Sequence, residues 1–130
     1  MERQDRWKAL GESSDALQAA LVEWTSAATP QTLAAVEEAA RRYTVGLAHI
    51  IGGSAADRHA MSLAAYQRAT ERLTALKATL RVVPSVDAAD TEFLRQVVVD
   101  QAAAGEAYEA AGADVVAAVE KARAQEKGRA

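Results

Sequence analysis

The sequence contains no cysteine, only two prolines and few aromatic residues, namely two Trp, three Tyr and one Phe. Without cysteine the chain has no disulfide, no thiolate metal ligand and no cysteine nucleophile. Because prolines are so few and glycines number only seven, few positions interrupt a helix. A composition rich in Ala, with some Leu and Val, favours closely packed helices over a sheet.

The chain also lacks a strong net charge, since its formal charge is -3 at pH 7. Such a chain has no general attraction to a phosphate backbone, so we do not expect it to bind nucleic acid. No apolar run reaches the length of a membrane span, and no basic and apolar leader follows Met1. We therefore expect no membrane association and a cytoplasmic location.

Apolar residues recur at alternating spacings of three and four, a pattern typical of amphipathic helices. It predicts helices over about residues 2–27, 30–51, 54–83 and 86–123, followed by a frayed C-terminal tail. Three turn signals separate them: Thr29-Pro30, Gly52-Gly53 before Ser54, and Pro84-Ser85 before Asp87. Gly11 and Gly112 leave open whether the first and last helices are interrupted there.

Such short connections make consecutive helices antiparallel neighbours. The sequence therefore predicts a single all-α domain over residues 1–130, an antiparallel up-down-up-down four-helix bundle with long Ala-rich helices. The seam positions of the third predicted helix are His59, Ser62, Tyr66, Ala69, Leu73, Leu76, Leu80 and Val83. A helix over 54–83 is about 45 Å long and needs partners along its length.

The last two predicted helices extend past the first turn and leave apolar side chains without partners from the first two helices. Five of these form the predicted partner interface: Leu76, Leu80, Val83, Val86 and Phe93. Contiguous apolar surface of this kind usually marks a contact site. The leading hypothesis is a non-enzymatic interaction or adaptor protein that self-associates, with a homodimer expected, or docks a protein partner. A tilt of the first helix over part of this surface is the alternative.

A polar layer is predicted within the bundle. Folding the sequence about its turns groups Tyr43, Ser62 and Tyr108, with Ser14 at the same level and His59 one step away. These side chains are able to line a pocket for a small ligand. They are equally able to bond neighbours and fix the register of the helices. No cofactor is expected, and no metal site, because neither His49 nor His59 has a Glu three residues before it.

One further pattern resembles a catalytic motif. Arg42 and His49 enclose six residues, Tyr43 to Ala48, which is similar to the Arg-x(4–6)-His signature of HEPN ribonucleases. This resemblance implies a dimeric helical bundle that cleaves RNA with Arg42 and His49. The other interpretation is a solvated Arg42 and a His49 that interacts with the carbonyl groups at the C-terminus of its helix.

Overall fold

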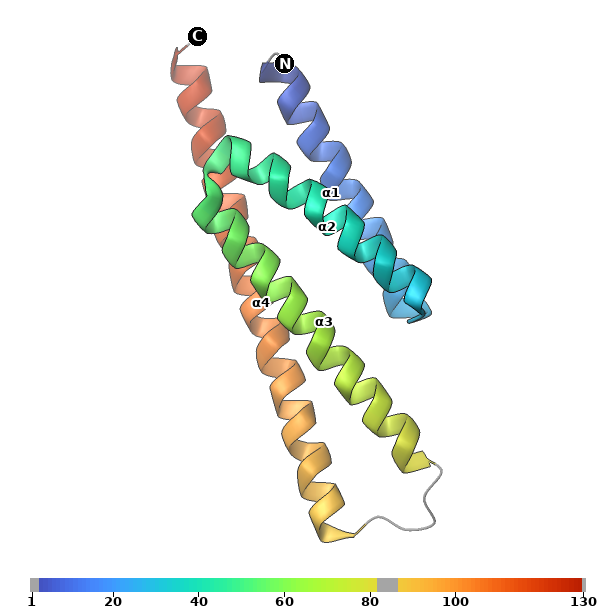
Figure 1. Ribbon diagram of the computed structural model, residues 1–130. Helices are drawn as coiled ribbons and strands as arrows, with labels where there is room; N and C mark the ends of the chain where they lie inside the picture. Colours follow the sequence, from blue (N-terminus) through green and yellow to red (C-terminus); the bar gives the residue numbers. More distant parts are fainter. Residues whose placement is uncertain (1–2, 82–86, 130) are drawn as a thin grey trace. The chain divides into compact units, whose positions relative to one another are not determined.

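The computed structural model describes residues 3–81 and 87–129, which form four α-helices and no strand (Figure 1). The helices are α1 Arg3–Ser26, α2 Pro30–Ile51, α3 Gly53–Arg81 and α4 Ala88–Arg129. The predicted all-α fold class is confirmed. α1 and α4 continue through Gly11 and Gly112. A single Gly costs a helix only about 1 kcal/mol relative to Ala, which the remaining residues of a long helix offset.

The start of α2 is fixed by Thr29 and Pro30, as the sequence predicts. The backbone N–H of Thr32 donates to the Thr29 hydroxyl at 3.1 Å, and the backbone N–H of Thr29 donates to Thr32 Oγ1 at 2.8 Å. Pro30 occupies the first turn, where its missing N–H leaves no hydrogen bond unmade. The short connection makes α1 and α2 antiparallel neighbours (Figure 1).

Gly52 ends α2 with a φ of 92°, which lies in the region that glycine adopts without steric cost. Its N–H donates to the carbonyl of Ala48 at 3.2 Å. Because one residue is enough to leave the helix, α3 begins at Gly53. This is one residue before the predicted start, so Ser54 lies inside the first turn, where its hydroxyl accepts a hydrogen bond from Arg58 Nη1 at 3.2 Å.

The start of α4 is capped by Asp87. Its Oδ1 accepts a hydrogen bond from the backbone N–H of Asp90 at 2.8 Å, which is the geometry of an N-cap residue. The helix therefore begins at Ala88, later than the predicted start at 86. The predicted turn at Pro84 and Ser85 lies outside the described residues.

The predicted end of the last helix near residue 123, with a frayed tail after it, is wrong. α4 continues to Arg129. Two contacts with Trp7 hold this end: Trp7 Nε1 donates to Glu126 Oε2 at 2.6 Å, and the Arg123 guanidinium lies 4.8 Å from the centre of the Trp7 ring. A helical end is stable where such contacts offset the entropy of ordering it.

The contacts along the chain divide it into two compact units, Met1–Ala60 with Val115–Ala130 and Met61–Asp114. In the first unit every helix contributes one buried residue to a shared core: Leu10, Leu47, Ala56 and Val115. Trp7, Tyr43, Ile50, Ile51 and Val119 pack around it. The predicted four-helix bundle is confirmed in this core, whereas a single domain over residues 1–130 stays a prediction.

In the second unit α3 and α4 form an antiparallel pair. The rings of Tyr66 and Tyr108 are stacked with centroids 5.8 Å apart. Gln101 Nε2 donates to Thr70 Oγ1 at 3.3 Å. A Cβ at Gly105 would lie 3.3 Å from Tyr66, so this glycine permits the ring to approach α4 closely.

Candidate functional site

A groove of about 950 Å³ lies between α1 and α2 in the first unit. Its lining on α1 consists of Arg6, Ala9, Leu10, Glu12, Ser13, Ala16, Ala19, Ala20 and Glu23. Its lining on α2 consists of Ala35, Glu38, Ala39, Arg42, Val45, Gly46, His49 and Ile50. We call this feature the α1–α2 groove. It is the candidate site because it combines an apolar floor with charged side chains of both signs.

Small side chains make up most of the floor. Ala9 and Ala16 are exposed, Ala20 is buried, and a Cβ added at Gly46 would lie 3.5 Å from Leu10 Cδ1. The last contact shows that residues 10 and 46 lie opposite each other across the groove. Because Ala and Gly project little from the helix, a partner helix is able to approach the backbone of α1 closely.

Leu10, Val45 and Ile50 are the apolar side chains larger than alanine that line the groove, and Val45 is the most exposed of them at 58%. An exposed valine next to a row of alanines adds apolar area that water must hydrate. Covering such area stabilises a complex by about 25 cal/mol for each Å² removed from water. The groove is therefore a surface on which contact with a second apolar surface is favourable.

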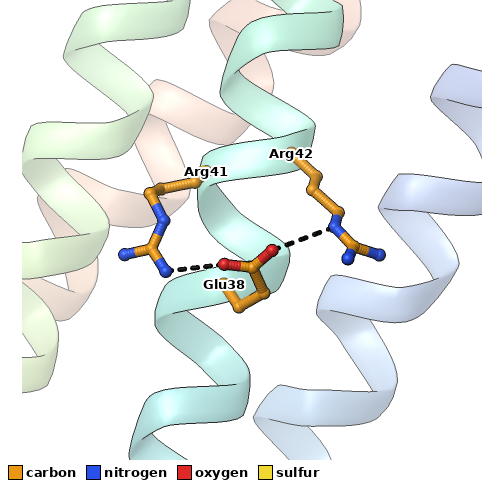
Figure 2. A network of polar contacts seen from close by, with 3 residues as sticks. All are labelled: Glu38, Arg41 and Arg42. Carbon is orange, nitrogen blue, oxygen red and sulfur yellow. Dashed lines mark hydrogen bonds and ion pairs between the residues drawn. The ribbon is translucent and has the colours of Figure 1, made fainter.

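The charge on the α2 side of the groove is organised by Glu38. Its carboxylate accepts hydrogen bonds from Arg41 Nη2 at 2.6 Å and from Arg42 Nε at 3.1 Å. Figure 2 shows the carboxylate between the two guanidinium groups, with Arg42 on the side of α1. The hydrogen bond from Arg41, together with the charges of both arginines, lowers the pKa of Glu38 below its ordinary value of 4.5.

The charges follow an order along the groove. Because α1 and α2 are antiparallel, Arg6 and His49 lie at the end far from the α1–α2 turn, and Glu23 lies next to that turn. Arg6 and Glu23 are about 26 Å apart along α1 at 1.5 Å per residue. The groove therefore has a basic end and an acidic end, with Glu12, Glu38 and Arg42 between them.

The two residues of the ribonuclease-like motif, Arg42 and His49, both line the α1–α2 groove. They lie two helical turns apart, about 10 Å along the axis of α2. Arg42 is hydrogen-bonded to Glu38, and Glu12 and Glu23 place further carboxylates in the same groove. Carboxylates next to a phosphate oppose its binding, and the catalytic assignment stays a prediction.

The structure brings together part of the predicted polar layer. Tyr43 and His59 meet edge to face with ring centroids 5.4 Å apart, and Tyr43 shares a hydrogen bond with Ser14. Burial raises the pKa of Tyr43, while this hydrogen bond opposes the rise. Tyr108 belongs to the second unit, where it stacks on Tyr66, and Ser62 belongs to the same unit. A ligand pocket lined by Tyr43, His59, Ser62 and Tyr108 together stays a prediction.

The burial of His59 predicts how the free energy of unfolding depends on pH. It is only 6% exposed, and burial lowers its pKa below the ordinary value of 6.5 because the imidazolium loses hydration. The unfolded chain therefore binds a proton at a pH where native His59 stays neutral. The contribution of His59 to the free energy of unfolding is fully present above about pH 6.5. We expect the free energy of unfolding to fall as the pH drops below that value.

This expectation is tested by urea unfolding at about pH 7.5 and about pH 5.5 on three proteins. The parent and the control His49→Gln, which changes an exposed histidine, should lose more stability between the two pH values than His59→Gln does. Equal losses in all three proteins would show that His59 is not protonated on unfolding.

The predicted partner interface lies in the second unit as far as it is described. Leu76 and Leu80 are partly buried, and Val83 and Val86 lie outside the described residues. Phe93 is 49% exposed, and the Arg72 guanidinium lies 5.4 Å from the centre of its ring. The other exposed valines of this part of α4, Val98 and Val99, lie about 140° and about 240° around the helix from Phe93. They do not extend its surface into one apolar face, and the interface stays a prediction.

Three comparisons with known proteins found no match for this chain. The chain matches no protein-family model, no curated protein and no solved structure. In the ranges 3–81 and 87–129 no three His, Asp or Glu side chains form a group that could hold a metal ion. No helix in the same ranges is both long and apolar enough to cross a membrane. The observations define an all-α protein with a charged, alanine-lined groove.

The sequence holds a signal for this groove beside the core seam. On α1 the groove positions Arg6, Ala9, Ser13, Ala16, Ala20 and Glu23 also alternate at spacings of three and four. They form a second stripe next to the core stripe, on a neighbouring face of the helix. Alanine and serine give little hydrophobic contrast with solvated residues, so periodicity of apolar residues does not reveal this stripe.

Proposed function

We propose that this chain is a non-enzymatic interaction protein that self-associates, and that the α1–α2 groove is its contact surface. The observation that carries the proposal is the groove itself, about 950 Å³ in volume with an alanine floor and charges of both signs. A second copy of the chain is the occupant to which we commit. It supplies an equal alanine-lined surface and the opposite charge at each end.

Close helix contact supports this choice. Helices pack with their axes 8–10 Å apart depending on the side chains between them, and alanine allows the short end of this range. A groove along about 26 Å of α1 suits a helix of similar length better than a compact small molecule. Two such hairpins placed face to face make a four-helix arrangement, the usual way to cover helical stripes of this kind.

The charge pattern favours a protein partner over RNA. Glu12, Glu23 and Glu38 line the groove together with Arg6, Arg42 and His49. Mixed charge is complementary to another mixed surface, whereas a polyanion needs a surface of one sign. The interaction hypothesis therefore agrees better with this groove than the ribonuclease hypothesis does.

The test is the solution mass of the purified chain by light scattering over a range of concentrations. We expect a dimer of the 13.7 kDa chain, and we expect Ala16→Arg to convert it to a monomer because an arginine at the exposed groove floor blocks close approach. The matched control is Ala34→Arg, an exposed alanine of α2 that does not line the groove, which should remain dimeric.

Two further variants test the interface predicted on α3 and α4. Leu80→Glu and Phe93→Glu should leave the dimer intact if the groove forms the contact. If these two variants dissociate and Ala16→Arg does not, the α3–α4 surface is the interface and the groove proposal is wrong. A parent that is monomeric at every concentration would contradict self-association altogether. Far-UV circular dichroism checks that each variant keeps its helix content.

A further inference from the structure

Nine positions of α1 line the groove, and the six that alternate at spacings of three and four are arranged symmetrically about a point between Ser13 and Ala16. Counted outward from that point, these six form three pairs: Ser13 with Ala16, Ala9 with Ala20, and Arg6 with Glu23. Of the other three, Leu10 and Ala19 are also counterparts, whereas Glu12 falls opposite Leu17, which does not line the groove. If α1 is turned end over end, each paired position falls on its counterpart. The small residues then meet small residues, and the basic end meets the acidic end.

We infer that the second copy lies antiparallel in the groove, with α1 against α1 of the partner subunit and Arg6 of each copy beside Glu23 of the other. This inference rests on the proposed function and adds the orientation and the residues that determine it. A two-fold axis across the groove, level with Ser13 and Ala16, generates the arrangement, as expected for an isologous dimer.

The alternative two-fold axis runs along the groove. It would set α1 against α2 of the partner subunit, again with opposite chain directions, and Arg6 would then lie beside His49 rather than beside Glu23. That arrangement leaves each Glu23 without an opposite charge on the partner subunit, so few favourable charge contacts form between the subunits. The arrangement with α1 against α1 joins unlike charges at both ends of the groove, which favours this register over others.

The α2 side of the groove is compatible with the same axis. Because residues 10 and 46 lie opposite each other, Arg42 is level with about residue 14 of α1, close to the axis. Two Arg42 side chains then approach each other. Each is hydrogen-bonded at 3.1 Å to its own Glu38 carboxylate, which also binds Arg41, and this carboxylate reduces the repulsion between the two Arg42 side chains. Glu38 lies one turn from Arg42, so it is also within reach of Arg42 of the partner subunit.

Charge reversal tests the orientation. Arg6→Glu and Glu23→Arg should each raise the Kd of the dimer roughly tenfold at low salt, since each creates two like-charge contacts. The double variant R6E/E23R should restore the Kd to within about threefold of the parent, because the two charges are exchanged and remain complementary. Within one chain these residues are about 26 Å apart, so the restoration cannot come from a contact inside a subunit. The effects should shrink in high salt.

Cross-linking gives a second measurement, because the chain contains no cysteine. Mixed single-cysteine variants Arg6→Cys and Glu23→Cys should form a mixed disulfide, which requires Cα atoms about 4–7 Å apart. Arg6→Cys mixed with His49→Cys should not.

Two results would overturn the arrangement with α1 against α1. One is a disulfide that forms only between Arg6→Cys and His49→Cys. The other is a double charge variant that dimerises as weakly as the single variants. The proposed function would still stand if Ala16→Arg dissociates the parent dimer. A monomeric parent would overturn both.

Discussion

Replacing Leu47 with Ala is expected to lower the free energy of unfolding by about 2–5 kcal/mol. Leu47 has no exposed surface and lies in the core to which all four helices contribute. Truncating it removes apolar contacts and leaves a cavity, because neighbouring side chains fixed on four different helices relax only in part. Urea unfolding followed by far-UV circular dichroism measures the change at a fixed protein concentration.

The matched control for this variant is Val22→Ala. Val22 is 66% exposed on α1 and does not line the groove, so its truncation should change stability by less than about 0.5 kcal/mol. A loss of less than about 1 kcal/mol for Leu47→Ala would mean that the four helices do not share a close-packed core at this position.

The core of the first unit follows from local rules in the sequence. The seam positions on the second predicted helix include Val36 and Leu47, and both are fully buried. Thr29 and Pro30 carry the information for the start of α2 in a few neighbouring residues. Such features are predictable because hydrophobic period and capping chemistry act over one or two helical turns.

Contacts between residues far apart in the sequence are not predictable in this way. Trp7 and Glu126 are separated by 119 positions, and nothing near Glu126 indicates that a partner will hold the end of α4. The start of α4 shows a second limit, because Ser85 and Asp87 are both good N-cap residues and Asp87 takes the role. Choosing between two adequate caps depends on packing, which local chemistry does not contain.

The periodicity of apolar residues does not reveal the α1–α2 groove either, because the groove depends on two helices. Its floor is built from alanine, whose side chain contributes little hydrophobic contrast but strongly affects how closely helices approach. The charges at its ends are recognisable only once α1 and α2 are placed side by side, because Arg6 and His49 then share one end. A surface of this type is defined by pairs of helices rather than by any single segment.

Trp7→Ala is expected to release the C-terminal end of α4 and to lower the free energy of unfolding by about 2–4 kcal/mol. The substitution removes the hydrogen bond from Trp7 Nε1 to Glu126 and the contact with Arg123. It also removes apolar area packed against the shared core. The amides of residues 120–129 should exchange with solvent at least roughly tenfold faster, because local opening of this end no longer breaks those contacts.

Hydrogen exchange of the intact chain separates the parts of this effect. Trp7→Phe keeps an aromatic ring beside Arg123 and the core but loses the donor to Glu126, so it should cause an intermediate acceleration. Glu126→Gln keeps an acceptor oxygen for Trp7 Nε1, so it should accelerate the exchange of residues 120–129 only slightly. Lys8→Ala, an exposed neighbour, should leave exchange unchanged. If Trp7→Ala leaves the exchange of residues 120–129 at the rate of the parent, Trp7 does not hold this end. Its helical state would then depend only on the residues of α4 themselves.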